Sequence, residues 1–184
     1  MCTGNQIRSP IAEAFVRRLT SALPVATRSM GLVDLRGEPP PQEAIEAAAA
    51  LGLDISMHRS RWMEPLALQH SDAVVGFELI HVAAAVVDGG ARAERTFMLR
   101  ELVELLELVD VPEGNAPAER ARLAVARADE RRRALGRRSV AAPVDDPLGR
   151  GRAAYRTAVR ELGELLPRLV NGLFRPVQVD DKPR

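Results

Sequence analysis

The most constraining feature of this 184-residue chain is a short polar segment near its N-terminus, Cys2-Thr-Gly-Asn-Gln-Ile-Arg8-Ser9. Apolar residues at helical spacing follow it directly, so a helix is expected to begin where the segment ends. If the segment wraps round an anion, successive backbone N–H groups point inward and the helix adds its positive end. Gly4 and Asn5 are residue types that tolerate the positive φ angles of so tight a loop. Residues 2–9 are therefore predicted to form an anion-binding loop.

The side chains of this loop indicate what it would do with a phosphate group. Arg8 can grip two phosphate oxygens with its planar guanidinium. We expect the same positive field to favour the thiolate form of Cys2, and Ser9 can donate a hydrogen bond to that thiolate. The sulfur would then lie beneath the phosphorus atom of a bound monoester. The loop therefore predicts nucleophilic phosphatase chemistry, with Cys2 as nucleophile and Arg8 as phosphate ligand.

Short apolar runs alternate with helical patterns along the rest of the chain, which predicts an α/β fold with a parallel sheet. The first helix is expected to have Ser9 as its N-cap, with Glu13 at capping-box distance. The expected strands are residues 24–29, 73–77 and 95–99. The expected helices are residues 9–23, 42–51, 78–87, 100–109, 118–135 and 152–174.

Bulk composition excludes several classes of protein. The net charge of +1 gives no general attraction to nucleic acid or to membranes, and no apolar stretch is long enough to span a bilayer. A single cysteine excludes an internal disulfide and a cysteine-based zinc cluster. The first residues do not resemble a signal peptide, so a cytoplasmic location is expected, with secretion by another route left open. The run Arg131-Arg132-Arg133 is expected to be a solvated helix face.

The loop resembles the motif C-x-G-N-x-C-R-S-P-x-A-E of the low-molecular-weight protein-tyrosine phosphatases, which it fits at eight positions. The resemblance covers residues 1–175 as one domain, with residues 111–142 as a longer, Arg-rich variation and 176–184 as a disordered tail. It implies a three-layer sandwich with a short parallel sheet in the order 2-1-3-4. It also implies hydrolysis of phosphotyrosine proteins through a phosphocysteine, without metal or cofactor, by a monomer or weak dimer. The residues expected to bind phosphate are Thr3, Gly4, Asn5, Gln6, Ile7 and Ser9.

A second match lies before the last helix, where Asp146 is followed by Pro147. The family resembled here carries its general acid in an Asp-Pro loop at this place. A phenolate or alkoxide leaves poorly without a proton donor, and the same carboxylate could later activate water. Asp146 is therefore the expected acid and base, and the adjacent Asp145 is the competing candidate.

The sequence departs from the family pattern in four places. The family has a hydrophobic strand before the cysteine, whereas only Met1 precedes Cys2 here. We therefore expect the first strand to be absent and the natural gene product to be longer, with about five more hydrophobic residues upstream. Ile7 replaces a second cysteine, so Cys2 should be easily over-oxidised. Gln6 fits neither the phosphotyrosine nor the phosphoarginine enzymes, and no aromatic pair follows Asp146.

Two other functions remain open. One is an arsenate reductase that uses an external thiol, because a relay through several cysteines of its own needs more than one cysteine. The other is a truncated relative that binds anions without catalysis, which the missing first strand favours. The sequence does not distinguish phosphotyrosine, phosphoarginine and arsenate as substrates.

Overall fold

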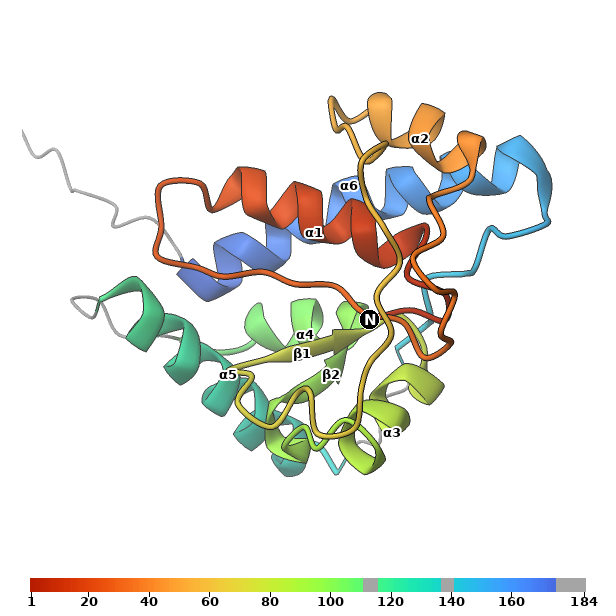
Figure 1. Cartoon of the computed structure of the whole chain (residues 1–184). Coiled ribbons are helices and arrows are strands. Elements are labelled where there is room, and N and C mark those ends of the chain that lie inside the picture. The colour runs from red at the N-terminus through yellow and green to blue at the C-terminus, as the bar shows by residue number, and fades with distance from the viewer. Residues whose placement is uncertain (111–115, 137–140, 175–184) are drawn as a thin grey trace, which may run out of the picture.

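A computed structural model describes residues 1–110, 116–136 and 141–174 of the chain. Two short parallel strands, β1 (Val74–Gly76) and β2 (Thr96–Met98), lie in its middle, with Val75 opposite Phe97. The predicted α/β fold is confirmed (Figure 1). The helices are α1 (Arg8–Leu19), α2 (Gln42–Ala49), α3 (Leu79–Val87), α4 (Leu99–Leu106), α5 (Pro117–Ala134) and α6 (Gly151–Phe174), with a 3₁₀ turn at Ala93–Arg95.

Helices cover the sheet on both sides. In Figure 1, α1 and α6 lie side by side above the strands, and α3 and α5 lie below them. The long helix α6 also contacts α2, α4 and α5, so it ties one layer to the other. Its apolar side chains repeat at helical spacing and are buried, as an amphipathic helix requires. The main core includes Ile11, Phe15, Phe97, Leu102, Leu162 and Leu166.

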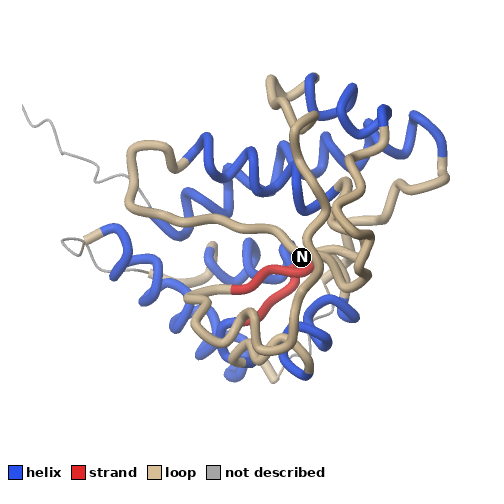
Figure 2. The backbone as a smooth tube through the Cα atoms, in the orientation of Figure 1, coloured by secondary structure: helices blue, strands red, loops and turns tan. Residues whose placement is uncertain are grey.

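The segment order beside the sheet follows the predicted 2-1-3-4 arrangement. Cys2 forms an isolated parallel bridge with Gly31, and the Met1 nitrogen donates to the carbonyl oxygen of Val75 in β1. The order is therefore Gly31, Cys2, β1 and β2. The predicted strand at residues 24–29 was wrong, because that segment is loop (Figure 2). Among the described residues it has no ladder of partners, and an extended chain without one is not a strand.

The start of α1 also differs from the prediction. The helix begins at Arg8, and Ile7 stands at its N-cap without a side-chain hydrogen bond. Ser9 and Glu13 therefore do not form the expected capping box, and both side chains bond to groups outside the helix. Ser9 contacts Cys2 and Asn5 in the preceding loop, and Glu13 accepts from Ser29, which is distant in sequence.

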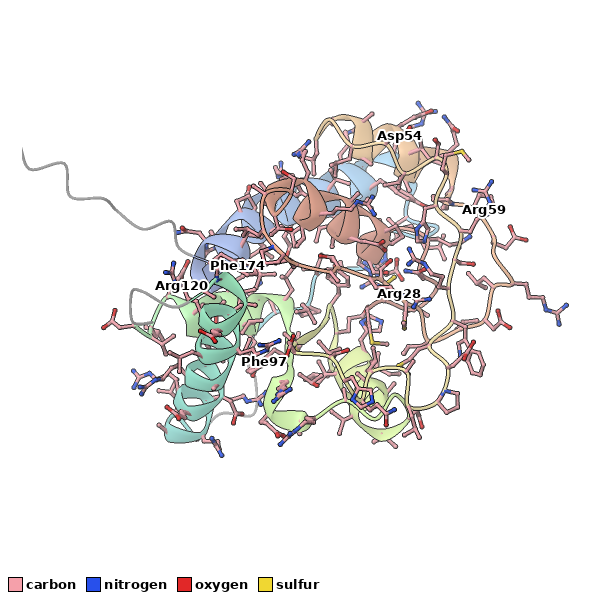
Figure 3. All side chains as sticks on the ribbon, turned by 60° about the vertical axis from the view of Figure 1, so that its left-hand side comes forward. Arg28, Asp54, Arg59, Phe97, Arg120 and Phe174 are labelled. Carbon is pink, nitrogen blue, oxygen red and sulfur yellow. The ribbon has the colours of Figure 1, made fainter. Side chains whose placement is uncertain are left out.

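The predicted solvated face on α5 was wrong for Arg132. Its guanidinium lies 4.2 Å from the ring centroid of Phe97 and donates to the carbonyl oxygen of Thr96 at 2.9 Å. Figure 3 shows Phe97 in the interior between α5 and the strands, and Arg120 beside the end of α6. Part of the arginine content of α5 therefore attaches this helix to the rest of the fold.

Some expectations concern residues outside this description. The described residues do not include 111–115 and 137–140, which lie within the expected 111–142 variation. They also do not include the expected tail at 176–184. Within the described parts of the chain, no helix combines the length and apolar character needed to cross a membrane.

Candidate active site

The sulfur of Cys2 lies at the bottom of the anion-binding loop. Its side chain is buried, and Sγ is 3.0 Å from the Ser9 hydroxyl oxygen. That oxygen accepts a hydrogen bond from the Asn5 amide at 2.9 Å. Because the amide can only donate, the proton of Ser9 is available to the sulfur. The first turn of α1 thus supplies a hydroxyl that can stabilise a thiolate.

Asn5 holds the middle of the loop. It is fully buried and has a φ of 51°, a left-handed value that asparagine tolerates better than most residues. Its amide also donates to Ser29 Oγ at 2.8 Å. Its side-chain oxygen accepts from the Arg61 backbone N–H at 2.8 Å and faces His58 Nε2 at 3.1 Å. One side chain therefore joins the loop to two distant parts of the chain, at Ser29 and at residues 58–61.

A buried carboxylate supports this network from behind. Glu13 Oε2 accepts from the Ser29 hydroxyl at 2.5 Å and from the Arg61 guanidinium at 2.8 Å. Burial by itself raises the pKa of Glu13, but these hydrogen bonds outweigh it and hold the pKa below its ordinary value. Glu13 is therefore ionised at neutral pH and fixes Ser29, which in turn fixes the Asn5 amide.

Gly31 allows the loop to pack closely against the neighbouring chain. A Cβ atom at Gly31 would lie 2.8 Å from the Thr3 carbonyl oxygen and 2.9 Å from the Asn5 nitrogen. Both are backbone atoms that cannot move without opening the loop. The glycine in Ser29-Met30-Gly31 is therefore a requirement of the site.

Arg8 is 99% buried and lies beside the loop with several partners. Nη1 donates to Glu78 Oε1 at 2.5 Å and to the Val144 carbonyl oxygen at 2.8 Å, and Nη2 donates to Asp146 Oδ2 at 2.7 Å. Its Nε is a buried donor without a hydrogen-bond partner among the described residues. Buried unpartnered donors are rare and costly, which makes Nε a natural donor to a bound oxyanion.

Of the two adjacent acids, the structure brings Asp146 to the site. Asp146 bonds to Arg8, and its other oxygen accepts from the Leu148 backbone N–H at 3.2 Å. Asp145 is mostly exposed and instead faces Arg150 at 3.3 Å. Asp146 thus has the geometry expected of the acid, and Asp145 does not.

Most of the residues singled out from the sequence surround one cavity of about 140 Å³. Asn5 and Ser9 lie behind it and support it through hydrogen bonds. Three aliphatic side chains complete the wall, and the sequence analysis did not anticipate them. The lining residues are Cys2, Thr3, Gly4, Gln6, Ile7, Arg8, Val33, Leu35, Asp146 and Leu148.

Sequence reasoning also missed Glu78 and His81. Glu78 pairs with Arg8, and His81 Nε2 lies 3.2 Å from the Thr3 hydroxyl. A signal was present, because a Glu and a His three residues apart follow the buried run of β1 at its carboxyl end. Parallel strands of α/β folds place their functional side chains at this edge. Among the described residues, no three His, Cys, Asp or Glu side chains form a candidate metal-binding group.

Comparisons with known proteins agree on one family. The family model described as low molecular weight phosphotyrosine protein phosphatase matches residues 1–121. A probable low molecular weight protein-tyrosine-phosphatase, EpsP of Ralstonia solanacearum, is 37% identical over 76 residues, which is 41% of this chain and 50% of the relative. The chain thus spans about half the length of this curated relative.

Solved structures show the same fold at low sequence identity. The low molecular weight protein tyrosine phosphatase from T. tengcongensis has a TM-score of 0.67 at 24% identity, covering 92% of this chain and 94% of its own. The YwlE arginine phosphatase from Geobacillus stearothermophilus has a TM-score of 0.66 at 23% identity, covering 94% and 88%. One fold is therefore shared by proteins named as a tyrosine phosphatase and as an arginine phosphatase.

Proposed function

Because the chain belongs to the low molecular weight phosphotyrosine protein phosphatase family, we propose that it hydrolyses phosphomonoesters on phosphorylated proteins through a phosphocysteine at Cys2. One observation carries this proposal: Cys2, Arg8 and Asp146 line the same small cavity although residue 146 is far away in sequence. A nucleophile, a cation for the phosphate and a carboxylate for the leaving group are the three parts that the reaction needs.

In the first step, the Cys2 thiolate attacks phosphorus and forms a P–S bond while the ester P–O bond breaks. Arg8 Nε, the loop amides and the N-terminus of α1 stabilise the charge on the phosphoryl oxygens. Asp146, as a carboxylic acid, gives its proton to the departing oxygen. The Ser9 hydroxyl, 3.0 Å from Cys2 Sγ, directs its proton toward the sulfur and holds it in place.

In the second step, water attacks the phosphocysteine and the P–S bond breaks. Asp146, now a carboxylate, takes a proton from that water, so inorganic phosphate leaves and the Cys2 thiolate returns. The hydrogen bond from Arg8 Nη2 to Asp146 at 2.7 Å supports the placement of this carboxyl group, because it holds Asp146 beside the phosphate-binding guanidinium.

The substrate class follows from the family and from the cavity wall. Phosphotyrosine proteins are the proposed substrates, in agreement with the name of the matched family. Val33, Leu35 and Leu148 form an aliphatic wall that can contact an aromatic ring or an alkyl chain. Values of kcat/KM for peptides of one sequence that carry phosphotyrosine, phosphoserine or phosphoarginine would show which leaving group the aliphatic wall prefers.

The experiment that tests the proposal measures hydrolysis of an aryl and an alkyl phosphate by the purified chain. Cys2→Ser should lower kcat by at least about a thousandfold for both substrates. Asp146→Asn should cost about a hundredfold with the alkyl ester and about tenfold with p-nitrophenyl phosphate, whose leaving group needs less protonation. Asp145→Asn is the matched control and should retain wild-type rates.

Two results would contradict the assignment. If Cys2→Ser still hydrolysed the esters at a rate near that of wild type, Cys2 would not be the nucleophile. Equal losses with Asp146→Asn on both esters would show that Asp146 holds Arg8 and does not donate the proton. Acid quenching during turnover gives an independent check, because a covalent phosphoryl adduct should accumulate on wild type when the second step is slow.

A further inference from the structure

His81 is a buried titratable side chain with no part in the steps above. It is the third residue of α3, and its side chain is fully buried. Gly76, the last residue of β1, leaves room for this side chain, because a Cβ atom at Gly76 would lie 2.8 Å from the His81 Cβ. A polar ring enclosed in this way needs partners for both of its nitrogens.

The two ring nitrogens have different partners, and these determine the tautomer. The Glu78 backbone N–H donates to His81 Nδ1 at 3.1 Å, so Nδ1 is an acceptor without a proton. The proton of the neutral ring is therefore on Nε2, which donates to the Thr3 hydroxyl at 3.2 Å. Burial, with the nearby Arg8 charge, lowers the pKa of His81 to about 4. The ring is therefore neutral, with a single tautomer, at neutral pH.

The ring lies between two parts of the candidate site. On one side, Thr3 follows Cys2 directly and lines the cavity. On the other side, Glu78 donates its N–H to the ring and accepts from Arg8 Nη1 with its carboxylate. The separation of 78 residues between Thr3 and His81 means that only the fold brings these groups together.

We propose that His81 is a positioning residue for the reaction at Cys2, which sets the Thr3 hydroxyl at one end of the loop and the Glu78 partner of Arg8 at the other. Because Thr3 Oγ1 accepts from His81, its own proton points away from the imidazole. Thr3 lines the cavity, so this proton is oriented as a donor for a phosphoryl oxygen. The inference rests on the proposed phosphatase function and assigns no proton transfer to His81.

Two amide substitutions separate the two halves of this role. In His81→Gln, the longer side chain can place its NH₂ near the position of Nε2 and keep the donor to Thr3. In His81→Asn, the shorter side chain can place its oxygen near the position of Nδ1 and keep the acceptor for Glu78, while the donor to Thr3 is lost. Thr3→Val removes the acceptor, and Thr3→Ser keeps it as the matched control.

The measurements are kcat/KM for p-nitrophenyl phosphate, the inhibition constant of inorganic phosphate and the melting temperature. His81→Asn and Thr3→Val should each lower kcat/KM and weaken phosphate inhibition by about tenfold, the size of one hydrogen bond. Thr3→Ser should remain within about threefold of wild type, and His81→Gln, which loses only the acceptor for the Glu78 N–H, should fall between His81→Asn and wild type. The double variant His81→Asn/Thr3→Val should be no worse than either single one, because both remove the same contact.

A purely structural role predicts a different pattern. His81→Asn and His81→Gln would then lose activity in proportion to their loss of melting temperature, and His81→Asn would add to Thr3→Val. That pattern, with an active wild type, overturns the positioning role and leaves the proposed function standing. A wild type that hydrolyses no phosphomonoester overturns the proposed function, and the positioning role with it.

Discussion

The two sides of the anion-binding loop are held by different chemistry. On the Asn5 side, a buried amide bonds to two serine hydroxyls and to the backbone of Arg61, and the ionised Glu13 supports them. On the Thr3 side, the contacts pass through one neutral imidazole, that of His81. The first side joins many groups to the loop backbone. The second side joins few groups, and they contact side chains that line the cavity.

This difference suggests a division of labour. The Asn5 side holds a residue with positive φ and a close approach at Gly31, so its loss should affect both the loop and the stability of the fold. The Thr3 side touches Thr3 and, through Glu78, Arg8, so its loss should affect turnover more than stability.

The largest effect is expected at Asn5. Asn5→Ala removes four side-chain hydrogen bonds and places alanine at positive φ. It should lower the free energy of unfolding by about 4 kcal/mol, at about 1 kcal/mol per bond, and abolish turnover. Urea denaturation gives the first quantity and p-nitrophenyl phosphate hydrolysis the second.

Asn5→Gly is the matched control for this variant. Glycine accepts positive φ but also lacks the amide, so it should be about 1 kcal/mol less damaging than alanine. If Asn5→Gly were as stable as wild type, backbone conformation alone would hold the loop, and the polar network would not.

The next effect is a pH dependence from the His81 side. The folded pKa of about 4 lies below the ordinary 6.5, so the unfolded chain binds the proton first as pH falls. The contribution of His81 to the free energy of unfolding is complete above pH 6.5. It falls by up to about 3 kcal/mol as the pH is lowered from 6.5 to 4. Urea unfolding of wild type and His81→Gln across this range measures it, and the variant should lack this part of the slope.

Other groups also titrate in acid, so the comparison with the variant is essential. The charged or titratable groups near His81 are present in both wild type and His81→Gln. They are Arg8, Glu78, Asp146 and the Met1 nitrogen. Parallel pH curves for wild type and His81→Gln would show that the buried ring protonates without cost. The neutral Thr3 side would then not be distinct from the charged Asn5 side.

The smallest effect is expected from Glu13→Gln on the Asn5 side. Its folded pKa is below the ordinary value, so its contribution is present above about pH 4.5 and is lost as pH falls through the folded pKa. At pH 7 the variant keeps an acceptor for Ser29 but loses the charge that faces Arg61, at a cost of about 1–2 kcal/mol. Urea unfolding at pH 7 and pH 4 measures both, and the difference from wild type should shrink at the lower pH.

The two sides of the loop should therefore lose stability in different pH windows. The His81 side weakens from pH 6.5 downward, whereas the Glu13 side weakens only below about 4.5. If Glu13→Gln and wild type already had the same free energy of unfolding at pH 6, the Asn5 side would lose stability in the pH window assigned to His81. The two sides would then not differ in their response to acid.

The local chemistry of the candidate site could be predicted from the order of its residues. The spacing of Cys2, Arg8 and Ser9 lies within one loop and one helical turn, so their meeting depends on little beyond backbone geometry. The strands β1 and β2 and helices α2 to α6 were also predictable within a few residues, because buried apolar runs and helical periodicity are local patterns. The Asp-Pro pair before α6 was found in the same way, as a short motif beside a helix start.

The distant groups that complete the loop are brought together by the fold alone. Glu78 and Asp146 reach Arg8 across 70 and 138 residues, and His81 reaches Thr3 across 78. Sequence spacing carries no information on such contacts. The capping box expected at Glu13 failed for a local reason as well, because Glu13 lies four residues after Ser9 and a capping box needs three. Ser29 and Arg61, distant in sequence, donate to its carboxylate instead. The proposed nucleophile could be predicted from its neighbours in sequence, whereas the groups that hold it in place are its neighbours only in space.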